Sequence, residues 1–342
     1  MIDLRSDTVT KPGLAMRQAM ANANVGDDVF AEDPTVIELQ EETARILGKE
    51  AALYAPSGCM ANQLAIAIHT TEGDEVLLEA DAHIFNYETT AASLLSRVQL
   101  YPLKAADRGL LSAADIKPAI REKAYYMPVT SVIAIENTHN RAGGTVYPIE
   151  RIREVSELAK ANSIIMHLDG ARLWNACAFS GLSPKDYADN FDTVSVCFSK
   201  GLGAPVGSAI AGTKDLIAKA RRFRKIWGGG MRQAGIIAAG ALYALRNNRE
   251  RLAEDHRKAR LFAETIQNFS KNIHIDFSRL ETNIVLLKID AVSDLSRALG
   301  MLKEKGVLLS LGSHGLLRAV THLDVSMEDC EKAAKEIVEL FG

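Results

Sequence analysis

The sequence predicts an α/β fold with a mostly parallel central sheet, because short apolar runs alternate with helical patterns as far as about residue 211. Several of these runs have hardly any polar positions, as expected of strands that are buried on both faces. Two of them lead to a lone charged residue, Asp169 in one case and Lys200 in the other. The carboxyl ends of parallel strands meet at one edge of a sheet, so we expect these two charges to lie close together.

The expected elements follow from hydrophobic periodicity and from turn residues. Helix 34–47 is the clearest, since Pro34 suits its first turn and Gly48 its C-terminal cap. The predicted strands are 51–55, 75–79, 98–103, 131–136, 163–169, 193–198 and 208–211, and the predicted helices are 14–23, 34–47, 60–69, 83–95, 113–122, 149–161, 214–226 and 232–245.

A smaller α+β domain is expected at the C-terminal end, after a long charged helix from residue 249 to about 269. We therefore divide the chain into a large domain, 1–246, and a small domain, 247–342. Segment 1–12 is expected to pack with the small domain, because Ile2 and Leu4 give it apolar anchors. The strands predicted there are 273–276, 283–289, 307–310 and 315–320, and the helices are 292–305 and 326–341.

Composition is that of an ordinary globular protein. Of 342 residues, 47% are hydrophobic and 24% charged, and the net charge of -3 argues against nucleic acid or an anionic membrane as the main partner. The apolar run 234–245 is too short to cross a bilayer. The cysteines at 59, 177, 197 and 330 have no metal-ligand spacing, and the N-terminus has no apolar signal segment. These features predict reduced thiols in a cytoplasmic protein.

Asp169 and Lys200 together suit pyridoxal phosphate. A buried carboxylate can hold the pyridine nitrogen protonated, and a lysine with a depressed pKa can carry the cofactor as an imine. Each residue also has a simpler interpretation: Lys200 could end its strand in solvent, and Asp169 could cap the next helix. We favour the cofactor for the pair, because two charges at strand ends in this spacing are hard to explain as caps.

Three other features fit such a site, and each has an ordinary alternative. Ser57-Gly58-Cys59 joins a strand to a helix N-terminus, which can bind a phosphate or be a plain capped turn. His83 follows a strand and can stack on a ring, or can be structural. Arg318 lies inside an apolar strand and needs an anion, either a substrate carboxylate or a structural acid. Helix 214–226 is basic, and its end with Gly228 to Arg232 can clasp a phosphate or be a solvated face.

With these residues assembled, the chain resembles the low-specificity L-threonine aldolases of the fold-type I, aspartate aminotransferase-like pyridoxal phosphate enzymes. The resemblance covers essentially the whole chain, and its motifs occur in matching order. They read LRSDTVT, GDDVF, EDPTV, PSG, NQ, AHI, ENTHN, HLDGARL, SKGLGAPVGS, GGGMRQ and VTHLD.

The resemblance implies a role for each matching residue. Lys200 forms the imine, Asp169 binds the pyridine nitrogen, and His83 stacks on the ring. Ser57, Gly58 and Cys59 lie at the phosphate. Arg172 reaches the ring hydroxyl and the substrate carboxylate, which Ser6 and Arg318 also hold; Lys225 and Arg232 join the phosphate side, from the same or a neighbouring subunit.

The resemblance also implies a homotetramer, a dimer of dimers with sites at the dimer interface. Some relatives have a cation near the positions of Thr8, Thr10 and Ser199; no metal is otherwise expected.

Three residues depart from the pattern of the family. Cys59 stands where relatives usually have threonine, which removes a hydroxyl donor to the phosphate. Tyr126 falls where several relatives have a histidine, and Phe30 replaces a usual tyrosine.

The implied reaction is reversible cleavage of L-threonine or L-allo-threonine to glycine and acetaldehyde, with His83 or a water that it orients as the base. The alternatives are another enzyme of this fold type, a racemase or a β-lyase, and a non-catalytic homologue.

Overall fold

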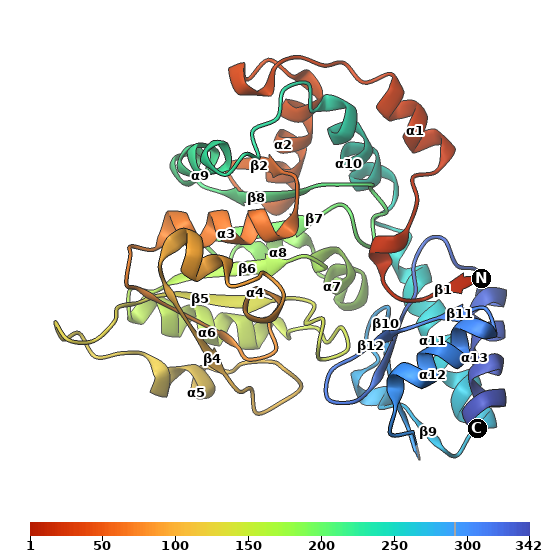
Figure 1. Ribbon diagram of the computed structural model, residues 1–342. Helices are drawn as coiled ribbons and strands as arrows, with labels where there is room; N and C mark the ends of the chain where they lie inside the picture. Colours follow the sequence, from red (N-terminus) through yellow and green to blue (C-terminus); the bar gives the residue numbers. More distant parts are fainter. Residues whose placement is uncertain (291) are drawn as a thin grey trace.

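The computed structural model describes residues 1–290 and 292–342, and its largest unit is a seven-stranded sheet with helices on both faces (Figure 1). The strand order is β2-β8-β7-β6-β5-β3-β4. Neighbours from β7 to β4 are parallel, which confirms the mostly parallel sheet. The strands are β2 (Ala51–Ala55), β3 (Glu75–Glu79), β4 (Gln99–Leu103), β5 (Thr130–Glu136), β6 (Ile165–Gly170), β7 (Thr193–Cys197) and β8 (Ser208–Gly212).

Strand β8 runs antiparallel to both of its neighbours, β7 and β2. The connection from β7 is residues 198–207, which is shorter than the dozen or more residues that a parallel crossover needs. The chain therefore turns straight back after β7, and this turn carries Lys200.

The sheet is buried on both faces because successive side chains of a strand point in opposite directions. In β2, Ala52 and Tyr54 lie in the core that includes residues of α2 and α6, whereas Leu53 and Ala55 lie in the core beneath α3 and α9. The helices are α1 (Leu14–Ala21), α2 (Pro34–Leu47), α3 (Gly58–His69), α4 (His83–Asn86), α5 (Ala113–Ile116), α6 (Ile149–Ala161), α7 (Leu173–Ser180), α8 (Pro184–Ala188), α9 (Lys214–Ile226), α10 (Gly235–Asn247), α11 (Leu252–Phe269), α12 (Leu295–Glu304) and α13 (Met327–Phe341).

Two predicted helices were wrong in extent, and two helices were not predicted. The helix expected over 83–95 stops at Asn86, because Thr89 and Thr90 adopt positive φ values of 54° and 60° that no α-helix allows. The helix expected over 113–122 ends at Ile116, before a 3₁₀ turn that contains Pro118. Helices α7 and α8 fill a stretch for which we predicted no element.

The C-terminal part has a core of its own, formed by a four-stranded antiparallel sheet in the order β12-β13-β10-β9 and by helices α11 and α13. The strands of this sheet are β9 (Ile273–His274), β10 (Ile284–Ile289), β12 (Ser310–Leu311) and β13 (Leu317–Val320), and β11 (Val307–Leu308) lies outside it. No helix in residues 1–290 or 292–342 is both long and apolar enough to span a membrane.

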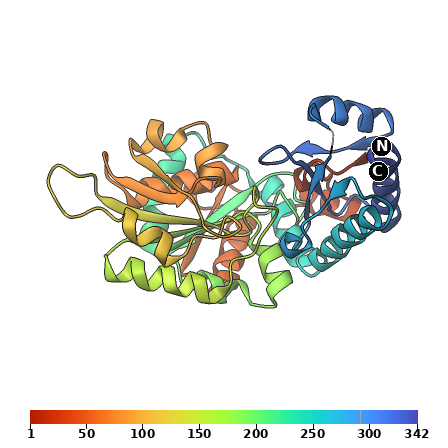
Figure 2. The same ribbon diagram turned by 90° about the horizontal axis from the view of Figure 1, so that it is seen from below.

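The N-terminal segment belongs to this second core. Ile2 and Leu4 are buried in it, and β1 (Ile2–Asp3) pairs in parallel with β11. Both termini consequently lie on the C-terminal part, as Figure 2 shows from a second direction. Residues 5–10 follow directly and are delivered to the edge of the large sheet, where the predicted site lies.

Candidate active site

Three acids gather at the carboxyl edge of the parallel strands. Glu79 ends β3, Glu136 ends β5, and Asp169 is the penultimate residue of β6. All three are buried, and Glu136 and Asp169 are register partners. Asp169 does not cap the next helix, because α7 begins at Leu173 with Arg172 as its N-cap. The capping interpretation of Asp169 is therefore wrong.

The Asp169 carboxylate is oriented by an amide from the helix above the sheet. Asn62 Nδ2 donates to Asp169 Oδ2 at 2.8 Å and to Glu88 Oε1 at 2.8 Å. Ser195 Oγ donates to Asn62 Oδ1 at 2.7 Å, which fixes the orientation of the amide. Asn62 thus links two buried carboxylates. Our sequence analysis gave it no role, although Asn62 and Gln63 are two adjacent polar residues in a largely apolar stretch of α3, which was a usable signal.

His83 is held at both its backbone and its ring. Its backbone N–H donates to Glu136 Oε2 at 2.7 Å, and its Nδ1 lies 2.9 Å from Glu88 Oε1. Burial acts to lower the pKa of His83, but the hydrogen bond to Glu88 and the charge of Asp169 outweigh it, so the pKa is raised. Glu88 was missed, because an acid in a predicted helix is usually solvated.

Lys200 is half-buried in the turn after β7 and lies within electrostatic reach of the same groups. Burial, followed by the charge of Glu88, raises the pKa of the Cys59 thiol to about 11, while Lys200 acts in the opposite direction. The charge of Lys200 also acts on His83 and on Asp7. The fold therefore brings Lys200 to the edge where Asp169 lies.

The turn Ser57-Gly58-Cys59 forms the N-terminus of α3. Ser57 is its N-cap, and its hydroxyl accepts a hydrogen bond from the backbone N–H of Met60 at 3.2 Å. A Cβ on Gly58 would approach Cys197 Sγ to 2.9 Å, so only glycine lets the turn lie this close to β7. Met60 in turn packs against the glycine turn 228–230, since a Cβ on Gly229 would nearly overlap its sulfur.

Arg172 is committed to a buried ion pair with Asp7. Its Nε and Nη2 donate to the two carboxylate oxygens at 2.8 and 2.7 Å, and its Nη1 donates to Asn140 Oδ1 at 3.2 Å. Burial alone would raise the pKa of Asp7, but the charges of Arg172 and Lys200 prevail and lower it to about 2. Asp7 was not among the predicted site residues.

Arg318 is a cation in need of an anion. Its Nε is buried and has no hydrogen-bond partner in the described part of the chain, and its Nη2 has only a 3.5 Å contact with the carbonyl of Arg5. Burial, reinforced by the positive charge of Arg172, lowers the pKa of Arg318 to about 10. Ser6 precedes Asp7, and its hydroxyl accepts from Thr8 Oγ1 at 2.8 Å.

Lys225 and Arg232 do not join this cluster within one chain. Lys225 is exposed, and Arg232 pairs with Asp27 at 2.9 Å on the surface. The buried cation of this region is Arg224, which donates to the carbonyl of Tyr54 and to the carboxylate of Asp28.

The remaining predicted residues lie at the surface or take part in local hydrogen bonds. Phe30 and Tyr126 are exposed, and Thr10 Oγ1 donates to the carbonyl of Asp7. The cation near Thr8, Thr10 and Ser199 stays a prediction.

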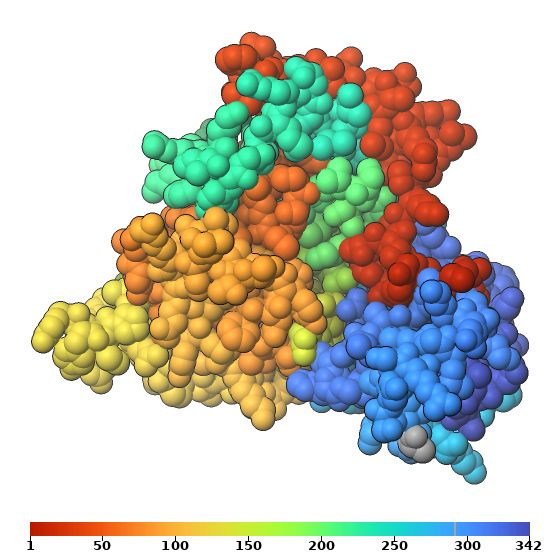
Figure 3. Space-filling model, in the orientation of Figure 1, coloured from red at the N-terminus to blue at the C-terminus, as the bar shows by residue number. Residues whose placement is uncertain are grey.

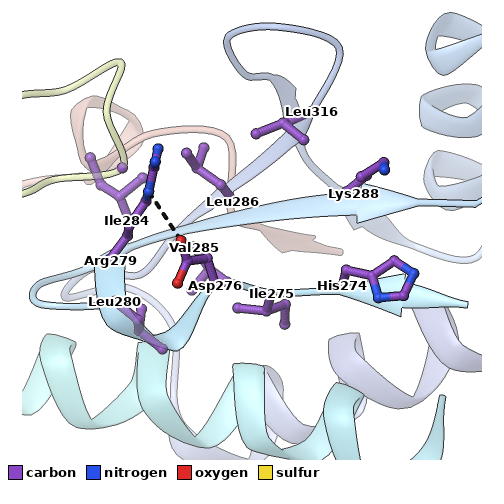
Figure 4. Close-up of a pocket in the computed structure, with 11 residues that line it drawn as sticks. His274, Ile275, Asp276, Arg279, Leu280, Ile284, Val285, Leu286, Lys288 and Leu316 are labelled. Atoms are coloured by element: carbon purple, nitrogen blue, oxygen red, sulfur yellow. Dashed lines mark ion pairs between the residues drawn. The ribbon is translucent and has the colours of Figure 1, made fainter. Parts of the chain in front are cut away.

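A pocket of about 350 Å³ lies in the C-terminal part, between β10 and the segment that contains β9 (Figure 4). Asp276 and Arg279, which form an ion pair, line it together with Leu286 and Lys288 of β10. None of the predicted site residues lines this pocket, so the cluster at the sheet edge is a separate feature.

Comparisons with known structures define the class. A threonine aldolase of Leishmania major superposes with a TM-score of 0.84 at 18% identity over 99% of each chain. An aspartate aminotransferase double mutant of Thermus thermophilus superposes with a TM-score of 0.74 at 17% identity, over 100% of this chain and 92% of that one. The fold is therefore that of the fold-type I pyridoxal phosphate enzymes.

Sequence comparison goes further. The family model for β-eliminating lyases matches residues 3–292. Low-specificity L-threonine aldolase 1 of Arabidopsis thaliana is 41% identical over 96% of this chain and 93% of its own length. The chain belongs to the β-eliminating lyase family and, within it, to the low-specificity L-threonine aldolases. The predicted family and fold type are confirmed.

The low pKa of Asp7 makes stability depend on pH. A carboxylate with a folded pKa of about 2 and an ordinary value of 3.8 adds about 2 kcal/mol above pH ~4, which is lost as the pH falls through 2. We expect Asp7→Asn to cost about 3–5 kcal/mol at pH 7, since it leaves Arg172 buried without a counter-charge. The free energy of unfolding of Asp7→Asn, measured in urea, should then change less between pH 5 and pH 2 than that of the parent protein. The exposed Asp215→Asn is the control, and equal losses for both variants would contradict the assignment.

Proposed function

We propose that this chain cleaves L-threonine, L-allo-threonine and related β-hydroxy-α-amino acids reversibly to glycine and an aldehyde, with pyridoxal phosphate as cofactor. The names of its relatives support this reaction. The observation that carries this proposal is the state of Arg318. Its Nε is buried and has no hydrogen-bond partner among the described residues, and its guanidinium lies within electrostatic range of Asp7. An α-carboxylate is the anion that such a site suits.

The residues present fit the cofactor. Asp169 offers a buried carboxylate for a ring nitrogen, Lys200 offers an amine at the same edge, and the N-terminus of α3 offers backbone N–H groups for a phosphate. Because Gly58 has no side chain, this turn can lie directly against Cys197 of β7. When bound, pyridoxal phosphate supplies a ring that accepts the electron pair released at Cα.

The side chains around Arg318 decide which bond breaks. Arg318 and the Ser6 hydroxyl would hold the substrate carboxylate, and this grip orients the Cα–Cβ bond for cleavage. Arg172 is predicted to assist, and its ion pair with Asp7 fixes the position of its guanidinium. Asp169 would accept a hydrogen bond from the protonated ring nitrogen of the cofactor, and hydrogen bonds from Asn62 and Ala171 fix the position of its carboxylate.

Cleavage also needs a group that removes the β-hydroxyl proton. His83, or a water that it orients, is our candidate, because Glu88 and Glu136 fix both its ring and its backbone. The proton leaves the hydroxyl as the Cα–Cβ bond breaks, and a proton delivered by Lys200 or by water returns to Cα to give glycine.

The first test is a visible spectrum of the purified protein, recorded before and after L-threonine, with glycine and acetaldehyde assayed in the same sample. We expect a yellow absorption band and equimolar products. Asp169→Ala should still bind the cofactor but lose about 10²-fold or more in turnover, the scale of losing one preorganised charged group. The exposed Asp189→Ala is the control.

Other outcomes select the alternatives. A threonine-responsive band without aldehyde would favour a racemase, and pyruvate with ammonia from a suitable amino acid would favour a β-lyase. A protein that takes up no pyridoxal phosphate would be a non-catalytic homologue.

Substitution of Arg318 tests the substrate assignment. Arg318→Ala should lower kcat/KM for L-threonine by roughly 10²-fold, because a desolvated carboxylate loses its charged partner. Arg318→Lys should lower kcat/KM by less than Arg318→Ala does, since lysine keeps the positive charge but not the two parallel hydrogen bonds of a guanidinium. Steady-state kinetics of both, beside the exposed Arg222→Ala, provide the measurement; unchanged KM and kcat in Arg318→Ala would refute the role.

We further propose a homotetramer with sites at a dimer interface, in the cytoplasm, and a division into domains 1–246 and 247–342. Loop 120–129 supports self-association: it projects from the body (Figures 1 and 3) and leaves Tyr125 100% and Tyr126 72% exposed. The exposed Lys225 and Arg232 are candidates for a neighbour's site. The four cysteines are all free thiols, which suits a reducing compartment.

Light scattering tests the assembly. The parent should have a tetramer's mass, and the double variant Tyr125→Ser/Tyr126→Ser should be smaller, because burial of two tyrosines stabilises an interface by several kcal/mol. Phe269→Ser, at a similarly exposed site in the C-terminal part, should leave the mass unchanged. A monomeric parent would refute the proposal.

A further inference from the structure

Side chains from two separate segments of the chain, Cys59 in one and His83 and Glu88 in the other, meet at the sheet edge with the chemistry of a metal site. Cys59, His83 and Glu88 each place one ligand atom within 4.8 Å of the others. Cys59 comes from the start of α3, His83 from the start of α4, and Glu88 from the loop that follows α4. Thiolate, imidazole and carboxylate together suit zinc and related transition metals, whereas magnesium and calcium prefer oxygen ligands alone.

We propose that Cys59, His83 and Glu88 bind a divalent transition-metal ion of the zinc class, and that this ion competes with the cofactor. Zinc bonds of about 2.0–2.3 Å place the ligands of one tetrahedral ion roughly 3.3–3.8 Å apart. Small side-chain rotations bring the three groups to that spacing. His83 Nδ1 and Glu88 Oε1 are 2.9 Å apart, and the ion takes the place of the proton that they share.

The surroundings support these three ligands. Asn62 donates to Glu88 Oε1 at 2.8 Å and Gln63 to Glu88 Oε2 at 2.7 Å, so the carboxylate is oriented as metal-bound carboxylates usually are. The thiolate and the carboxylate together balance the charge of a dication. Cys59 is exposed and the His83 side chain is 28% exposed, which gives an ion a path in from solvent and leaves room for water as fourth ligand.

Competition follows from shared residues and rests on the proposed function. Cys59 belongs to the turn proposed for the phosphate, and His83 is the side chain proposed to stack on the ring. A metal ion bound to Cys59 and His83 would therefore block the cofactor from the phosphate turn and from the His83 ring. Metal binding by itself does not depend on the proposed reaction, so the two can fail separately.

Cobalt provides the readout, because a thiolate bound to Co²⁺ gives a charge-transfer absorption band in the near ultraviolet. The full-length chain, freed of pyridoxal phosphate, should bind one equivalent of Co²⁺ with this band, and Zn²⁺ should displace it. Cys59→Ser should abolish the band and weaken Zn²⁺ binding, measured by calorimetry, by about 10-fold or more. Cys177→Ser removes a thiol outside the cluster and should behave as the parent.

Three results would overturn the proposal. The band could persist in Cys59→Ser, disappear in Cys177→Ser, or remain at full strength in Glu88→Gln with unchanged Zn²⁺ affinity. Cys59→Thr serves as a second variant, and circular dichroism confirms that each variant is folded.

Saturation with pyridoxal phosphate should suppress the Co²⁺ band; equal binding to loaded and unloaded protein would refute competition. A chain that binds Co²⁺ through Cys59 but takes up no pyridoxal phosphate would refute the proposed function and leave the metal site standing.

Discussion

The arrangement of this protein depends on a carboxylate that cannot be buried alone. Asp7 is fully buried, and an isolated charge in that position would cost several kcal/mol. It is tolerated because Arg172, the N-cap of α7, donates two hydrogen bonds to it. Ile2 and Leu4 anchor the preceding residues in the C-terminal core. The ion pair between Asp7 and Arg172 therefore connects the N-terminal segment, and with it the C-terminal core, to the edge of the large sheet.

The same pair determines the electrostatics of the site. Because Asp7 largely neutralises Arg172, the cation left to attract an anion is Arg318, whose pKa falls through burial and through the nearby charge of Arg172. An anion that reaches Arg318 relieves that cost and leaves the ion pair between Arg172 and Asp7 in place. The substrate binding that we propose at Arg318 and the docking of the N-terminal segment therefore depend on the same set of charges, those of Asp7, Arg172 and Arg318.

Much of this was readable from the sequence, for a physical reason. Strands buried on both faces give uninterrupted apolar runs, so the sheet and the edge that carries Asp169 and Lys200 could be predicted. The break after α4 could not, because nothing local announces that Thr89 and Thr90 take positive φ. The roles of Asn62 and Glu88 were not predicted because they depend on tertiary contacts. Polar residues in a largely apolar stretch of α3 indicate that Asn62 is unusual, but not that it donates to both Glu88 and Asp169, which are distant from it in the sequence.

Position 59 combines both kinds of information. The family resemblance marks the cysteine as a departure from threonine, but the sequence alone gives only one consequence, a lost hydroxyl donor at the phosphate turn. The structure adds a second, because the sulfur lies beside an imidazole and a carboxylate that are already oriented by Asn62, Gln63 and Glu136. Compared with threonine, cysteine lacks both the hydroxyl and the methyl group; under our proposals it therefore holds a phosphate less well and offers a sulfur ligand to a transition-metal ion at the same place. Under these proposals, the lost hydroxyl donor and the added sulfur ligand both make the turn less suited to a phosphate and more suited to a cation.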